Sequence, residues 1–182
     1  ILGCIAGLCK DKLPDAIIRV FSSIGISMPG YVIASGLMIF LAVNLKVLPV
    51  NYNKPGGWVM PMLTLAIYPT SYLTRLTRAS ILEVMNQDYL RTERAKGMSE
   101  FVVVFIHALK NSLIPVITYL GPLTASILTG GFVAESVFSV PGLGRYFVSS
   151  ISSRDYTMIM GVTIFYSALI VFMNLICDIL YK

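Results

Sequence analysis

This sequence of 182 residues has few charged side chains, one histidine and three cysteines. Asp, Glu, Lys and Arg make up 13% of it, whereas a soluble domain carries about a quarter. The cysteines, Cys4, Cys9 and Cys177, include no Cys-x-x-Cys pair, so neither a disulfide framework nor a zinc site is indicated. No G-x-x-x-x-G-K-[ST] segment is present, which excludes a phosphate-loop ATPase within these residues.

The residue types that carry catalysis and metal binding are also scarce. His107 is the only histidine, and no Glu-x-x-His pair or second ligand lies near it, so we expect a structural hydrogen bond there. The formal net charge of +5 is not accompanied by a basic-aromatic nucleic-acid-binding module. We therefore expect neither an enzyme, nor a metal site, nor a nucleic-acid-binding protein.

Long apolar segments are what the sequence contains. Apolar residues make up 56% of it, and the mean hydropathy is +0.79. A helix needs about 20 apolar residues to cross the hydrocarbon core, where only helices and closed barrels pair their backbone groups. This length predicts spans at about 20–45, 57–84, 112–135 and 156–180, with residues 1–9 as the end of a fifth. The fold class is therefore an all-α, polytopic transmembrane helix bundle, expected to be one domain over 1–182 that is truncated at both ends.

The distribution of basic residues predicts which side faces the cytoplasm. Ten of the 14 Lys and Arg residues lie on one side of the predicted bundle. They are Lys10, Lys12, Arg19, Arg75, Arg78, Arg91, Arg94, Lys96, Lys110 and Lys182, against Lys46, Lys54, Arg145 and Arg154 on the other side. Because cytoplasmic loops of membrane proteins are enriched in Lys and Arg, we expect residues 86–111 and the C-terminus in the cytoplasm.

Residues 86–111 form the longest polar segment and are expected to dock a partner at the membrane surface. Residues 89–96 suit a short helix, with Gly97 as its C-cap and Ser99 as the N-cap of a second helix. The apolar run 101–106 is compatible with a helix or a strand, and a helix is favoured because a lone strand leaves backbone groups unpaired. Arg75 and Arg78 are expected to lie on a helix that projects into the cytoplasm or to snorkel to the headgroups, and the two interpretations are compatible.

Proline and glycine mark two further places. Pro29 and Gly30 inside the span 20–45 predict a kink or a close helix contact. On the opposite side, Val140-Pro141-Gly142-Leu143-Gly144 has the composition of a sharp turn within an interfacial or re-entrant segment.

Three stretches of the sequence carry a family resemblance. YLRTERAKGMSEFVVVFIHALKNSLIPVI, FVAESVFSVPGLGRYF and RDYTMIMG resemble the peptide and nickel branch of bacterial ABC-importer permeases, the dipeptide/oligopeptide permease B type. The resemblance covers nearly the whole chain and is densest over 82–182. In that family the cytoplasmic EAA loop reads Glu-Ala-Ala, three residues, Gly, nine residues, then Ile-x-Leu-Pro. Gly97 and Leu109 match it, and the departures typical of this branch are Arg91-Thr92-Glu93, His107 and Lys110.

The resemblance implies an ABC type I importer transmembrane domain in the bacterial cytoplasmic (inner) membrane. It implies a permease subunit that forms a path for peptides, with nickel or a metal chelate as the alternative cargo. The implied partners are membrane lipid, a second homologous permease subunit, two cytoplasmic ATP-binding subunits that hold ATP and Mg, and an extracytoplasmic solute-binding protein. No cofactor is expected on this chain. A secondary transporter is disfavoured because the spans lack internal charges and a clear repeat.

Two sets of residues are candidates for partner contacts. The resemblance implies a coupling helix that contacts the ATPase, and the candidates for this contact are Arg91, Glu93, Arg94, Lys96, Gly97, Phe101, Val102, Phe105, His107 and Leu109. Candidates for contact with the binding protein at the outer turn are Glu135, Pro141, Gly142, Gly144 and Arg145; for Glu135 and Arg145, simple solvation is the equal alternative.

Overall fold

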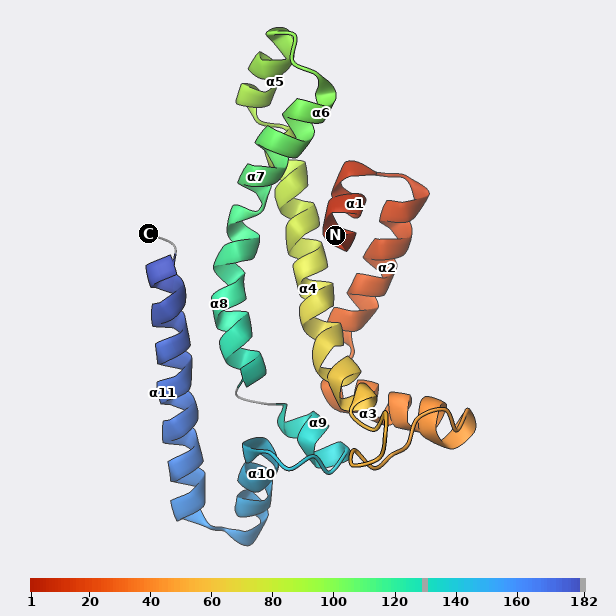
Figure 1. The fold of residues 1–182 in the computed structure, drawn as a ribbon, viewed down its shortest axis with the longest axis vertical. Coiled ribbons are helices and arrows are strands. Elements are labelled where there is room, and N and C mark those ends of the chain that lie inside the picture. Colours follow the sequence, from red (N-terminus) through yellow and green to blue (C-terminus); the bar gives the residue numbers. More distant parts are fainter. Residues whose placement is uncertain (129–130, 181–182) are drawn as a thin grey trace. The chain divides into compact units, whose positions relative to one another are not determined.

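The computed structural model describes residues 1–128 and 131–180, which form helices joined by turns and loops (Figure 1). None of the described residues lies in a strand, so the all-α prediction is confirmed. The one predicted domain is divided into two compact units. Unit 1 contains Ile1–Ile26 and Thr70–Leu120, and unit 2 contains Ser27–Pro69 and Gly121–Lys182.

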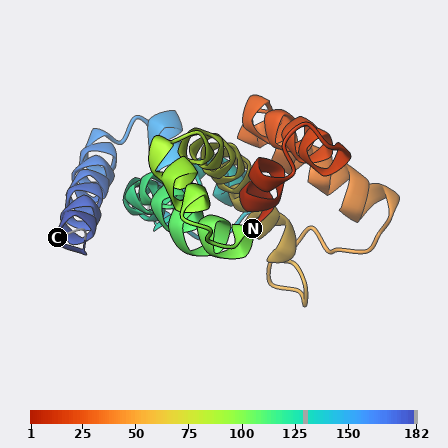
Figure 2. The same cartoon turned by 90° about the horizontal axis from the view of Figure 1, so that it is seen from above.

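Unit 1 contains an amino-terminal helical hairpin and the predicted docking segment. Its elements are α1 (Leu2–Leu8), α2 (Leu13–Ser27), the second part of α4 (Val59–Met85), α5 (Asp88–Ala95), α6 (Glu100–Val102), the π-helical segment η2 (Val103–Ala108), α7 (Leu109–Ser112) and the start of α8 (Ile114–Leu128). Both views show α1 and α2 side by side (Figure 1, Figure 2). The turn between them contains Asp11 with a φ of 59°.

Helix α4 carries buried polar side chains that are paired within the helix itself. The hydroxyls of Thr74 and Thr77 donate to the carbonyls of Thr70 and Leu73, each at 2.7 Å. Such bonds satisfy a hydroxyl without a partner from another helix.

Helix α4 begins at Val59, two residues after the predicted start at 57, and continues to Met85, close to the predicted end at 84.

Unit 2 is built around a small apolar core. Its elements are α3 (Gly30–Leu37), the π-helical segment η1 (Met38–Asn44), the first part of α4, the end of α8, α9 (Phe132–Val137), α10 (Leu143–Ser153) and α11 (Tyr156–Leu180). Ala34, Met60, Ala134 and Phe138 form the buried cluster. Asp155 accepts a hydrogen bond from the Met158 N–H at 3.0 Å, which caps the start of α11.

Within the described part of the chain, two helical stretches are long and apolar enough to cross a membrane, Glu100–Thr124 and Tyr156–Ile176. A third is present if Leu13–Ser27 and Gly30–Asn44 count as one broken span. Helix α4 is not among them, although 57–84 was predicted to span. Its threonines, tyrosines and arginines reduce its mean hydropathy.

The predicted span 20–45 is interrupted at Pro29 and Gly30, where a kink or a close helix contact was predicted. Helix α2 ends at Ser27 and α3 begins at Gly30, with Pro29 at the N-cap position in an extended conformation, φ −59° and ψ 142°. Proline has no N–H for the helical ladder, and it disfavours the helical conformation for the preceding residue, Met28. The Pro-Gly pair therefore breaks the helix rather than kinks it.

The predicted span 112–135 also needs correction. A continuous helical stretch begins earlier, at Glu100, and a separate helix, α9, begins at Phe132. Residues 129 and 130 lie outside the described residues. The helix over 156–180 has the predicted bounds, and the end of the chain at Lys182, expected in the cytoplasm, lies outside the described residues.

Candidate functional site

A tight turn around Gly97 organises the segment 86–112. Helix α5 ends at Ala95, and Gly97 has a φ of +83°. The Gly97 N–H donates to the Arg94 carbonyl at 3.0 Å, and the Met98 N–H donates to the Glu93 carbonyl at 3.4 Å. This pair of bonds is a Schellman motif, which ends a helix with a residue in the left-handed conformation. The predicted cap at Gly97 is thus present, and Ser99 has the N-cap position without a side-chain capping bond.

An apolar cluster holds the two sides of this turn together. Leu90 on α5 and Val103 on η2 are fully buried, with Ala108 beside them. Val84 and Met85, at the end of α4, pack against the same cluster. Fully burying one Leu or Val side chain contributes about 1.5–3 kcal/mol, so this contact alone favours one arrangement of α4, α5 and η2. Sequence reasoning missed this cluster, because it joins residues of α4 and α5 to residues of η2 that lie apart in the sequence.

Polar contacts also connect the two sides of the Gly97 turn. Arg94 donates to both Glu100 carboxylate oxygens, at 2.8 to 3.2 Å. His107 Nε2 lies 3.3 Å from Glu93 Oε2. Because the Arg94–Glu100 pair is exposed, it adds little stability but restricts the orientation of the turn.

The outer face of the segment is apolar and exposed. Phe101, Phe105 and Ile106 are 67%, 52% and 54% exposed, and we refer to these three residues as the apolar ridge. The rings of Phe101 and Phe105 stack with centroids 4.7 Å apart. A contiguous exposed apolar surface beside a fixed turn is typical of a protein interaction site.

The ten residues predicted to contact an ATPase are therefore in different situations. Arg91, Lys96, Phe101 and Phe105 are exposed, whereas Val102 and Leu109 are half-buried. Glu93, Arg94 and His107 are engaged within the segment, and Gly97 forms the turn. All ten lie in one segment, and only the exposed side chains among them are accessible to a partner.

The residues of the predicted outer turn lie on two helices and in the turn between them: Glu135 is on α9, Pro141 and Gly142 precede α10, and Gly144 and Arg145 are in its first turn. Glu135 Oε2 accepts a hydrogen bond from the Arg145 N–H at 3.0 Å, so the carboxylate caps this helix. A Cβ atom on Gly142 would collide with this carboxylate, and one on Gly144 would lie 2.8 Å from Phe132 Cδ1 and 3.0 Å from the carboxylate oxygen. The Arg145 Nη1 donates to the Ser139 carbonyl at 3.2 Å, and Pro141 is exposed beside them. Glu135 and Arg145 thus have an internal role in the fold, and contact with a binding protein stays a prediction.

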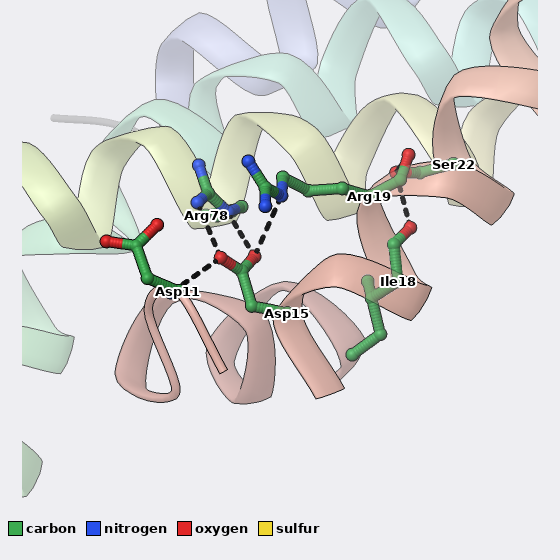
Figure 3. Close-up of polar contacts among 6 residues, drawn as sticks. All are labelled: Asp11, Asp15, Ile18, Arg19, Ser22 and Arg78. Carbon is green, nitrogen blue, oxygen red and sulfur yellow. Dashed lines mark hydrogen bonds and ion pairs between the residues drawn. The ribbon is translucent and has the colours of Figure 1, made fainter. Parts of the chain in front are cut away.

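A buried ion pair in unit 1 was not foreseen. Asp15 on α2 is 0% exposed, and Arg78 on α4 donates to its Oδ1 at 2.6 Å and to its Oδ2 at 2.8 Å (Figure 3). Arg78 therefore binds a carboxylate, in addition to either of the two roles predicted for it. The two residues are 63 positions apart, so no local pattern in the sequence indicates the pair.

Comparison with known proteins agrees with this architecture. Residues 1–182 match the family described as binding-protein-dependent transport system inner membrane component. The chain belongs to this family. It is 46% identical, over its whole length, to the dipeptide transport system permease protein DppB of Bacillus subtilis. It is 38% identical over 98% of its length to the oligopeptide permease protein OppB of Haemophilus influenzae, and 38% identical over 99% to the glutathione permease protein GsiC of Salmonella choleraesuis.

The chain spans 59% of the length of the Bacillus subtilis relative and 60% of that of the Haemophilus influenzae relative. Membership of an inner membrane component family and the apolar helices make this a multi-pass membrane protein. Within the residues that the structure describes, no three His, Cys, Asp or Glu side chains are grouped to hold a metal ion.

Proposed function

We propose that this chain is the transmembrane domain of a permease subunit in an ATP-driven importer, and that the segment 86–112 docks a cytoplasmic ATPase subunit. The observation that carries the proposal is the apolar ridge, which lies on a helix fixed by the Gly97 turn in a membrane protein of this family. An amphipathic helix that inserts such a ridge into a groove is a common mode of protein recognition.

The continuity of the helix explains how docking could drive transport. The ridge lies near the start of the helical stretch Glu100–Thr124, which is also long and apolar enough to cross a membrane. A displacement of the ridge therefore passes into that helix without an intervening flexible loop. The exposed charges of Arg91 and Lys96 would orient the partner rather than supply most of the affinity.

The cargo that we propose is a peptide. Relatives that the chain matches along nearly its whole length carry names of dipeptide, oligopeptide and glutathione permeases. Nickel or a metal chelate is the alternative cargo. The remaining parts of the machine are a second permease subunit, two ATP-binding subunits that hold ATP and Mg, and a solute-binding protein outside the cytoplasmic membrane.

A pull-down of the ATPase subunit tests the docking proposal. The full-length complex is prepared with Phe101→Ala and Phe105→Ala together, and with Ile164→Ala as a matched control. Ile164 is 68% exposed on α11, outside the docking segment. Loss of an anchor residue at an interface costs about 2 kcal/mol or more, so we expect ATPase recovery to fall by at least about thirty-fold in the double variant only.

Uptake of a labelled dipeptide and of a nickel chelate into proteoliposomes is measured on the same preparations. Equal ATPase recovery and equal uptake in the double variant and the wild type would contradict the docking proposal. Uptake of the chelate without the dipeptide would support the alternative cargo instead.

A further inference from the structure

The carboxylate of Asp15 joins three parts of unit 1. Arg78 on α4 binds both of its oxygens, and the Asp11 N–H, in the turn between α1 and α2, donates to Oδ2 at 3.0 Å. Arg19, one turn further along α2, places its Nε 3.6 Å from Oδ1. Figure 3 shows these groups converging on the carboxylate from the turn, from α2 and from α4. One side chain therefore connects the hairpin to α4.

The bidentate geometry fixes more than a distance. A guanidinium that donates two parallel bonds to one carboxylate restricts both the separation and the relative orientation of the two side chains. Burying a charged pair brings little net stability, because desolvation opposes the attraction, and an apolar pair of similar size packs as well. The pair is thus better suited to defining the position of α2 on α4 than to stabilising the fold.

Helix α1 is seated on the same stretch of α4. A Cβ atom on Gly3 would lie 2.6 Å from the Thr74 carbonyl oxygen, and one on Gly7 would lie 2.8 Å from Ile81 Cγ2. The glycines thus allow α1 to approach α4 on either side of Arg78 in the sequence. The hairpin contacts α4 over Thr74–Ile81, and the last of these residues, Ile81, lies about one turn before Val84 and Met85.

Those last two residues connect α4 to the docking segment. Val84 and Met85 pack against the cluster of Leu90 and Val103, and α4 continues without a break from Arg78 to Met85. A sequence of buried contacts and one continuous helix therefore leads from the apolar ridge to Asp15.

We propose that Asp15 and Arg78 are positioning residues for coupling: they fasten the α1–α2 hairpin to α4, so that displacement of the segment 86–112 moves the elements of unit 1 together. This inference rests on the proposed docking function of that segment. It assigns to the ion pair the transfer of movement to α1 and α2, a step that follows docking and differs from it.

Three variants of the pair separate positioning from folding. Arg78→Lys keeps the charge and replaces the planar two-point contact by a single ammonium. Asp15→Asn keeps the shape and removes the charge. Asp15→Leu with Arg78→Met replaces the pair by apolar side chains that restore packing. Arg75→Lys is the matched control, because Arg75 is exposed on the same helix one turn earlier.

The experiment uses the complete importer in proteoliposomes and measures ATPase recovery, ATP hydrolysis and dipeptide taken up per ATP hydrolysed. We expect recovery and hydrolysis to remain within about two-fold of wild type in all variants, because the apolar ridge is unchanged. Uptake per ATP should fall by about ten-fold or more in the three pair variants, because each of them removes the two-point contact that fixes the orientation of α2 on α4. Arg75→Lys should keep the wild-type ratio.

Wild-type uptake per ATP in the apolar double variant or in Arg78→Lys would overturn the inference, because an intact bidentate pair would then be unnecessary. If Asp15→Asn lowers only the amount of folded complex while Arg78→Lys keeps the ratio, the pair is a folding contact and the inference is equally wrong. The docking proposal fails separately, through unchanged ATPase recovery in the ridge variant.

Discussion

Substitution of Gly97 distinguishes backbone conformation from surface chemistry in the docking segment. Gly97 has a φ of +83°, and a Cβ atom built on it meets no other atom within 4 Å. Alanine therefore introduces no clash, and its cost is that of the left-handed conformation, about 1–2 kcal/mol. Asparagine and aspartate enter that region more easily, because their short polar side chains bond to the local backbone.

The magnitude follows if docking requires the formed turn. A cost of about 1–2 kcal/mol lowers the equilibrium constant for forming the turn by a factor of about 5–30. We expect the affinity of Gly97→Ala for the ATPase to fall by up to that factor, and the affinity of Gly97→Asn to stay close to wild type. Gly97→Asp should weaken docking more than Gly97→Asn, because it adds a negative charge beside the exposed Lys96 and so reduces the positive charge of the docking surface.

The assay is a titration of purified ATPase subunit onto the complete permease complex in detergent or nanodiscs. It yields an apparent dissociation constant for each of the three variants. Wild-type affinity in Gly97→Ala, or equal losses in Gly97→Ala and Gly97→Asn, would refute the requirement for a left-handed residue. Equal affinities of Gly97→Asn and Gly97→Asp would show that the charge at this position has no role in docking.

Two further predictions concern packing within each unit, the first within unit 1 and the second within unit 2. Leu90→Ala should destabilise the docking segment by about 2–5 kcal/mol and Leu90→Met by less than about 1.5 kcal/mol, since Leu90 is fully buried. The rate of proteolytic cleavage within 86–112 measures this difference, and equal rates in the two variants would contradict the prediction. Gly144→Ala should lower the free energy of unfolding by about 1–3 kcal/mol, because its Cβ would lie 2.8 Å from Phe132 Cδ1. A Cβ on Gly161 meets no atom within 4 Å, so Gly161→Ala should melt at or above the wild-type temperature. Equal melting temperatures of the two variants would contradict this prediction.

Some helices and turns could be predicted from local features of the sequence. The length of the charge-free run correctly predicted α11, and the glycine that follows a polar helix correctly predicted the turn at Gly97. Pro29 was recognised as a disturbance, but its effect was underestimated. Whether a proline bends or ends a membrane helix depends on which neighbours satisfy the freed backbone groups, and one segment does not contain that information.

The candidate site was predicted as a set of residues but not as a surface. Which residues of the run 101–106 are buried cannot be predicted until the rotation of this helix about its axis is known. In the structure Val103 and Val104 are buried, and Phe101 and Phe105 are exposed. This rotation is set by the cluster around Leu90, which combines residues from three elements. Likewise, the Asp15–Arg78 pair requires that α2 and α4 already be side by side.

Two of the ion pairs of unit 1, Arg94–Glu100 and Asp15–Arg78, have different physical consequences. Arg94–Glu100 crosses the Gly97 turn at the surface, where solvent and salt screen it, and the buried contact of Leu90 with Val103 spans the same gap. The turn therefore remains rigid when this exposed pair is screened. Asp15–Arg78 has the opposite character, since the carboxylate is fully buried and only 19% of the Arg78 side chain is exposed. Resistance to displacement along unit 1 thus resides in buried contacts, and under the docking proposal we expect the exposed charges, such as those of Arg91 and Lys96, to influence which partner binds.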